Sequence, residues 1–153
     1  MNLDGFALPV KKLKGTDPVE MLDLSGKNLG VASAVVIASL IGVNGGLTSL
    51  DLSYNELCGL DRQGSGTYTA DGITAIADAL RVNGGLTSID LSGNKIHGIW
   101  YDYAWGGRGT YTEEGATAFA DVLRVNGALR VKYENPYEEQ WKYGHLNGRY
   151  GQI

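Results

Sequence analysis

One cysteine and one of the two histidines are the residues of this chain that could form a nucleophile. Cys58 and His97 occupy the same place in two similar stretches of sequence, so the fold could bring them together. A neighbouring histidine can activate a thiol by accepting its proton. No third residue that would orient the histidine can be identified, and one Cys with one His is too few ligands for zinc. We therefore assign no catalytic residue, no metal ligand and no cofactor, and we expect a protein that is not an enzyme.

Three aspartates recur in a pattern that suits binding. Asp23, Asp51 and Asp90 each stand between two apolar residues, in Leu-Asp-Leu-Ser or Ile-Asp-Leu-Ser. Because alternate side chains of a strand point to opposite faces, the aspartates would form one outward row, with Ser49 and Ser88 beside it. Carboxylates on neighbouring strands, ~4.8 Å apart, repel by roughly 0.8 kcal/mol in water, which an approaching Lys or Arg would relieve. The row predicts either a surface for a basic partner or simply soluble residues at an exposed position.

A third candidate is an aromatic segment. Trp100, Tyr101, Tyr103 and Trp105 place four large rings within a short stretch, which two glycines follow. Such rings are frequent in interface hot spots because they give contact area at low entropic cost. Aromatic rings also stack on sugar faces, so a small-ligand or glycan site is the alternative. Most aromatic residues of the chain follow residue 99, and their packing against one another is an equally good interpretation.

These candidates belong to repeated segments that must position them. Three segments of similar sequence begin at Val19, Leu47 and Leu86. After each, apolar residues recur at helical spacing. Asn83-Gly84 and Asn126-Gly127 then predict the helix ends, since Gly adopts the left-handed cap conformation at little cost. Each unit is therefore predicted to be a strand, a turn, a helix and a stop.

The order L-x-x-L-x-L-x-x-N-x-L resembles the leucine-rich repeat signature, and the helical second half of each unit resembles the ribonuclease-inhibitor-like subclass. The resemblance covers about residues 19–128. It implies a short α/β solenoid, a right-handed superhelix with a parallel sheet on the concave side and helices on the convex side. It also implies that Asn55 and Asn94 hydrogen-bond free backbone groups where the chain leaves the sheet. Lys27, at that place in the first unit, cannot accept such bonds.

Unit spacing and the two ends complete the predicted organisation. Insertions at about 58–69 and 97–112 fall between strand and helix, so they should lie side by side along one rim. An N-terminal segment is expected to cap the first helix, whose outer face carries Val35 and Ser39 instead of charges. After the last helix, Lys132 stands where a core leucine belongs. The predicted divisions are residues 1–18 for the N-terminal cap, 19–128 for three repeats and 129–153 for a capping tail.

Charge, hydropathy and cysteine content limit the classes of partner that the sequence predicts. The net charge of −4 argues against nucleic acid, whose phosphates need a clustered Lys/Arg surface. No apolar run approaches the ~20 residues of a membrane span. A single cysteine excludes an internal disulfide, so the default compartment is the cytoplasm. The sequence thus predicts a non-catalytic module that binds another protein through the concave face and the inserted loops. A partner with a basic surface is one option that the aspartate row leaves open. The sequence predicts no oligomeric state.

Overall fold

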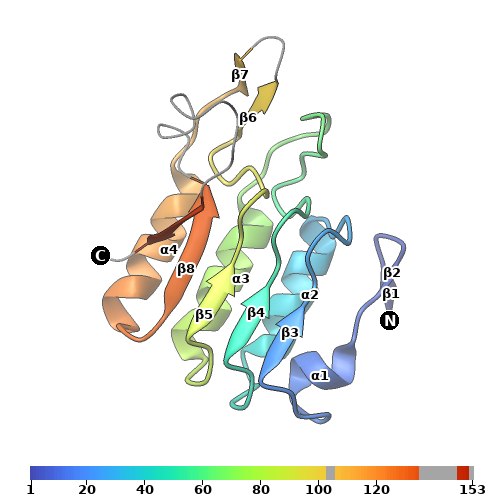
Figure 1. Cartoon of the computed structure of the whole chain (residues 1–153), viewed down its shortest axis with the longest axis vertical. Helices are drawn as coiled ribbons and strands as arrows, with labels where there is room; N and C mark the ends of the chain where they lie inside the picture. Colours follow the sequence, from blue (N-terminus) through green and yellow to red (C-terminus); the bar gives the residue numbers. More distant parts are fainter. Residues whose placement is uncertain (103–105, 135–147, 152–153) are drawn as a thin grey trace.

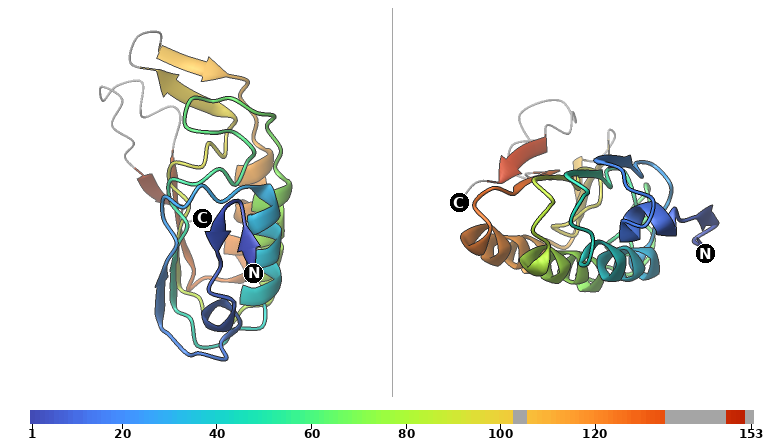
Figure 2. Two further views of the ribbon diagram at one scale, coloured as in Figure 1. Left: turned by 90° about the vertical axis from the view of Figure 1, so that its right-hand side faces the viewer. Right: turned by 90° about the horizontal axis from the view of Figure 1, so that it is seen from below.

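A sheet and a layer of helices lie back to back in this protein (Figure 1). The computed structural model describes the backbone of residues 1–102, 106–134 and 148–151. In chain order the elements are β1 (Asn2–Leu3), β2 (Phe6–Ala7), α1 (Val10–Lys14), β3 (Met21–Asp23), α2 (Val31–Ile41), β4 (Ser49–Asp51), α3 (Asp71–Val82), β5 (Ser88–Asp90), β6 (Ile99–Asp102), β7 (Gly106–Gly109), α4 (Glu114–Val125), β8 (Arg130–Glu134) and β9 (Gly148–Gly151). Helices α2, α3 and α4 cover one face of the sheet, and no helix of the described residues covers the other face (Figure 2).

The main sheet is parallel up to its last strand. Strands β3, β4, β5 and β8 pair in parallel, and β9 pairs antiparallel with β8. The register aligns Leu22, Leu50, Ile89 and Val131 in one row. Of these, only Leu22, in the edge strand β3, is not fully buried. The predicted mixed α/β fold with a parallel sheet is therefore confirmed.

The apolar residues of the repeat pattern form one continuous core. Leu52 and Leu57 from the strand side, and Ile76 and Leu80 from α3, are all buried in the same cluster. A fully buried large aliphatic side chain contributes about 1.5–3 kcal/mol. Because each unit shares its core with its neighbours, this burial stabilises all of them together.

The last parallel strand corrects one prediction. Alignment on Leu129 puts Lys132 at a core position, but in the structure Val131 pairs with Ile89 and Lys132 pairs with Asp90. The chain has one residue fewer between Leu129 and Val131 than the preceding units have at that place. A valine is thereby buried, and the large cost of desolvating an ammonium group is avoided.

Asn55 and Asn94 hold the turns that follow β4 and β5. Each side-chain oxygen accepts backbone N–H groups of the preceding unit, and each side-chain amide donates to carbonyls of both units. Asn94 accepts from the Leu57 N–H at 3.2 Å and donates to the carbonyls of Leu52 at 2.8 Å and Leu91 at 3.0 Å. The structure thus has the asparagine bonds that the resemblance implies.

Asparagines also end the helices, although not in the predicted way. Helix α3 ends at Val82 as expected, but Gly84 has no positive φ, and neither does Gly127 after α4. The hydrogen bonds of the Asn83 side chain end the helix instead. Its amide donates to two carbonyls of the preceding unit, and its oxygen accepts two N–H groups of the turn ahead. The prediction that a glycine in the left-handed conformation ends each helix was therefore wrong.

The N-terminal segment packs on the first unit but leaves part of α2 open. Leu8 and Leu13 are buried in the common core. Asp4 accepts hydrogen bonds from the Gly30 N–H at 2.8 Å and the Ser33 hydroxyl at 2.5 Å, which places a carboxylate at the start of α2. The prediction that the outer face of this helix is covered was wrong among the described residues, because Val35 is 47% exposed. Within the part of the chain that is described, no helix has the length and apolar character needed to cross a bilayer.

Candidate functional site

Asp23, Asp51 and Asp90 project from the open face of the sheet. They pair in register across β3, β4 and β5, one residue beyond the buried row. Asp23 is exposed, and Asp51 and Asp90 are half-buried. The register brings the three carboxylates into the single outward row that strand alternation predicts.

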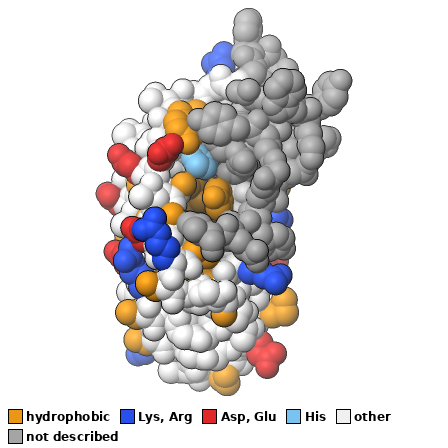
Figure 3. Space-filling view, turned by 90° about the vertical axis from the view of Figure 1, so that its left-hand side faces the viewer, with side chains coloured by type: hydrophobic (Ala, Val, Ile, Leu, Met, Phe, Trp, Pro, Cys, Tyr) orange, Lys and Arg blue, Asp and Glu red, His pale blue; other side chains and the backbone are white. Residues whose placement is uncertain are grey.

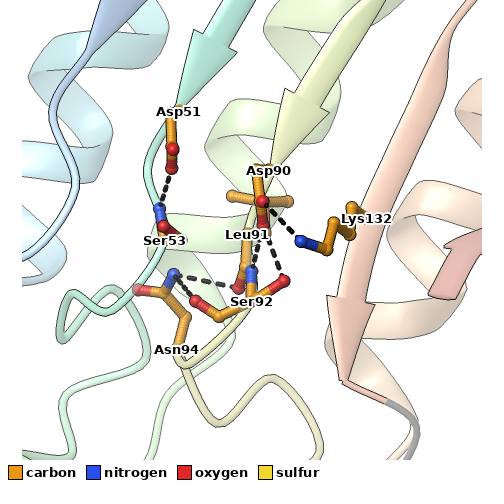
Figure 4. A network of polar contacts seen from close by, with 7 residues as sticks. All are labelled: Asp51, Ser53, Asp90, Leu91, Ser92, Asn94 and Lys132. Atoms are coloured by element: carbon orange, nitrogen blue, oxygen red, sulfur yellow. Dashed lines mark hydrogen bonds and ion pairs between the residues drawn. The ribbon is translucent and has the colours of Figure 1, made fainter. Parts of the chain in front are cut away.

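Each aspartate also stabilises the turn that ends its strand. The Oδ1 atoms of Asp23, Asp51 and Asp90 accept the backbone N–H two residues ahead, at 2.8, 2.8 and 2.9 Å. Figure 4 shows these bonds for Asp51 and Asp90. In the third unit the Ser92 hydroxyl donates to the same Asp90 oxygen at 2.6 Å. An Asx turn of this kind accounts for an aspartate at this position in every unit, without any partner.

A cation completes the row at its far end. Lys132, opposite Asp90 on β8, places Nζ 3.1 Å from the Asp90 Oδ2 (Figure 4). Both oxygens of Asp90 are therefore engaged within the chain. Asp51 differs, since the only hydrogen bond of its side chain to the described residues is the one that Oδ1 accepts from the Ser53 N–H.

Hydrogen bonds within its own turn favour the ionised form of Asp23. The Ser25 hydroxyl is the larger cause and the Ser25 backbone N–H the second; together they lower the pKa of Asp23 below its ordinary value of 3.8. Lys27 adds a small attraction in the same direction. Asp23 is thus a carboxylate at any physiological pH.

A second row runs beside the aspartates. Met21, Ser49, Ser88 and Arg130 pair across the same four strands. Met21 is 73% exposed, the two serines are half-buried, and Arg130 is exposed. The open face is thus apolar and acidic at its β3 end and basic at its β8 end. Figure 3 views the molecule from the β8 and α4 end, where charges of both signs lie beside apolar groups.

The two insertions lie together above the sheet, as predicted for one rim. The first folds back on itself through a bridge between Leu60 and Gly66, and the second forms the β6–β7 hairpin. Trp100 joins them, because a Cβ at Gly64 would lie 2.0 Å from its ring and one at Gly109 would lie 2.5 Å from it. Tyr68 makes a second link by donating its hydroxyl to the Ile96 carbonyl at 2.7 Å.

The packing of Trp100 bears on the aromatic candidate. The ring of Trp100 is half-buried and uses part of its surface to hold the two insertions together. This contact is the internal packing that rivals a binding role for that residue. The side chains of Tyr101, Tyr103 and Trp105 lie outside the described residues.

The Cys58 and His97 pair offers no accessible nucleophile. Cys58 is fully buried, so a substrate does not reach its sulfur. His97 stacks on Tyr111, with ring centroids 5.5 Å apart, and contacts Tyr133 at 5.9 Å. Its buried Nδ1 has no hydrogen-bond partner among the described residues, and burial lowers the pKa of His97 below 6.5. These contacts give His97 a packing role at the base of the second insertion.

One exposed residue on the edge of this face, Tyr54, was not predicted from the sequence. Tyr54 has φ of +55° and is 51% exposed, whereas Gly26 and Gly93 fill the equivalent places with φ of +61° and +76°. A left-handed conformation is unfavourable for a tyrosine by roughly 1–2 kcal/mol. The signal available in the sequence was an aromatic residue at a position that the other units give to glycine.

Comparison with known proteins identifies one part of this arrangement. Over the described residues, no group of three or more His, Cys, Asp or Glu side chains is placed to hold a metal ion. No curated protein matches the chain. The family model for the Leucine Rich Repeat matches residues 46–66, which contain β4 and Asn55. Residues 46–66, with their strand and asparagine turn, are therefore similar to a leucine-rich repeat.

Proposed function

We propose that this chain is a protein-interaction module that binds its partner through the open face of the sheet. We further propose that its units form a short solenoid of the ribonuclease-inhibitor-like type, with this face concave; one full helix in each complete unit supports the subclass. Leucine-rich repeat domains generally mediate protein–protein interaction and are generally non-catalytic. The observation that carries the proposal is the in-register row of outward carboxylates on a face that none of the described helices covers.

The partner we propose is a protein with a basic surface. Lys132 on Asp90 is an internal example of how an ammonium group docks on this row. Asp23 and Asp51 make only their turn hydrogen bonds among the described residues, so both can accept a partner's Lys or Arg. Met21 beside them offers apolar contact area, which a charged pair alone lacks.

The rim of inserted loops is the second element of the proposed surface. It supports binding because longer loops on a rigid scaffold commonly carry recognition. Trp100, Tyr101, Tyr103 and Trp105 remain in this part of the proposal. The contact of Trp100 with Gly64 leaves only part of its ring for a partner. That contact gives no support to the glycan-binding alternative, which needs an open ring face.

A charge reversal on each layer tests the proposal. The wild type, Asp51→Lys and Asp78→Lys are each immobilised and exposed to a cell extract. A protein that is captured is identified and purified. Its affinity for each of the three proteins is then measured in solution by titration calorimetry. Asp78 lies on the exposed side of α3, so its variant makes the same charge change on the helical face.

We expect Asp51→Lys to weaken the Kd at least about tenfold, since hydrogen bonds to charged groups contribute about 1.5–3 kcal/mol. The Kd of Asp78→Lys should stay within about twofold of the wild type. Equal affinity of all three proteins would show that the partner does not use the sheet face.

A further inference from the structure

The dipeptide Asn-Gly occurs at the same place in three successive units, after α2, α3 and α4. These sites are Asn44-Gly45, Asn83-Gly84 and Asn126-Gly127. An asparagine before glycine is chemically labile, because the unhindered glycine nitrogen can attack the side-chain carbonyl carbon. Gly45, Gly84 and Gly127 have the same surroundings in one respect, since a Cβ built on any of them would meet nothing within 4 Å. Differences among the sites therefore come from the asparagine side chains.

In the first two sites the side-chain amide is locked by four hydrogen bonds. Asn44 Nδ2 donates to the carbonyls of Lys12 and Leu13, both at 3.0 Å, and its Oδ1 accepts from the N–H groups of Gly46 and Leu47. Asn83 repeats this pattern one unit later, with donor bonds of 2.6 and 2.8 Å. The two residues are only 3% and 4% exposed. Attack on either side chain requires these bonds to break first.

Asn126 lacks this lock. Its side-chain amide takes part in no hydrogen bond with any described residue, and it is half-buried instead of buried. The Leu129 N–H bonds the backbone carbonyl of Asn126, at 3.3 Å, whereas the equivalent Leu86 N–H bonds the side-chain oxygen of Asn83. The segment that follows this turn also differs, because it has one residue fewer between Leu129 and Val131 than the preceding unit has between Leu86 and Ile89.

We propose that Asn126 is a site of spontaneous deamidation, and that the two equivalent asparagines are protected by the fold. The amide nitrogen of Gly127 attacks Cγ of Asn126, the Cγ–Nδ2 bond breaks, and ammonia leaves with the proton of the glycine amide. Water then opens the resulting succinimide at either carbonyl and gives aspartate or isoaspartate. Water is the only co-reactant. The product carries a new carboxylate at the C-terminal end of α4, where the helix dipole disfavours negative charge.

Site-resolved peptide mapping tests this proposal. The folded protein is kept in mildly alkaline buffer, samples are digested with trypsin over time, and the gain of one mass unit is followed in each peptide. Asn126, Asn83 and Asn44 fall in the separate peptides 125–130, 82–95 and 28–62, and Asn147-Gly148 falls in another peptide. Because the second also contains Asn94 and the third Asn28 and Asn55, fragmentation of each peptide assigns the mass gain to one asparagine.

We expect Asn126 to convert at least about tenfold faster than Asn83 and Asn44, because the net strength of one or two hydrogen bonds corresponds to that factor. In concentrated urea the three rates should converge, since the unfolded chain protects none of them. Equal rates for Asn126 and Asn83 in the folded protein would overturn the proposal.

A variant separates succinimide formation from direct hydrolysis. Gly127 has no positive φ and space for a Cβ, so Gly127→Ala keeps the fold while its methyl group hinders the attacking nitrogen. The Asn126 rate should fall severalfold in this variant, and the far-ultraviolet circular dichroism should be unchanged. An undiminished rate would overturn the proposed route.

Discussion

Replacement of Asn94 by alanine removes the side chain that ties the second unit to the third. Asn94 is fully buried, and three backbone groups depend on it. The Leu52 carbonyl keeps a bond from Asn55, at 3.0 Å. The Leu57 N–H and the Leu91 carbonyl lose the only hydrogen bonds that they make with a side chain of the described residues. An unsatisfied buried group costs about 1–3 kcal/mol, so the two together should cost about 2–6 kcal/mol.

Urea denaturation followed by circular dichroism measures this loss as a lower midpoint at an unchanged m-value. The matched control is Asn126→Ala, which removes an asparagine that makes no side-chain hydrogen bond with the described residues. Its effect should stay below about 0.5 kcal/mol. A loss of less than about 1 kcal/mol for Asn94→Ala would refute the view that this side chain supports the turn.

Three further perturbations test individual residues. Tyr54→Gly should raise the free energy of unfolding by up to about 1 kcal/mol, because glycine adopts φ of +55° without strain, and a loss in urea denaturation would contradict this. Lys132→Met should cost about 0.5–1 kcal/mol at low salt and less at high salt, because it removes the half-exposed ion pair with Asp90, and a salt-independent cost would exclude that cause. Burial lowers the pKa of His97 in the folded state, so the unfolded chain binds the proton more tightly. The thermal midpoint should therefore fall as the pH drops below about 6.5. His97→Phe should flatten this dependence of the midpoint on pH.

The core and its supporting turns could be predicted from the sequence because their signals are periodic. Leucines at strand spacing and apolar residues at helical spacing identify which side chains are buried, as Leu52 and Ile76 show. The position of Lys132 could not be read from the same periodicity, because a deletion of one residue shifts everything after it. Weighing a buried valine against a buried ammonium group would have found the correct register.

The candidate site was predictable in its geometry and less so in its contacts. The row of aspartates follows from strand alternation, and its turn bonds could have been found from the Asp-x-Ser spacing, which is typical of an Asx turn. The contact between Trp100 and Gly64 depends on how two separate loops meet in space. Nothing in either loop's own sequence specifies that meeting.

The antiparallel direction of β9 determines where further repeat units can be added to the sheet. A further parallel strand appended beside β8 would compete with β9 for the same backbone groups, and the two strands require different hydrogen-bond spacings. Between β4 and β5, by contrast, both joints are parallel, and a duplicate of residues 47–85 would present matching ladders to each neighbour. Protein engineers who wish to widen the sheet should therefore insert copies in its middle and leave the terminal strand undisturbed.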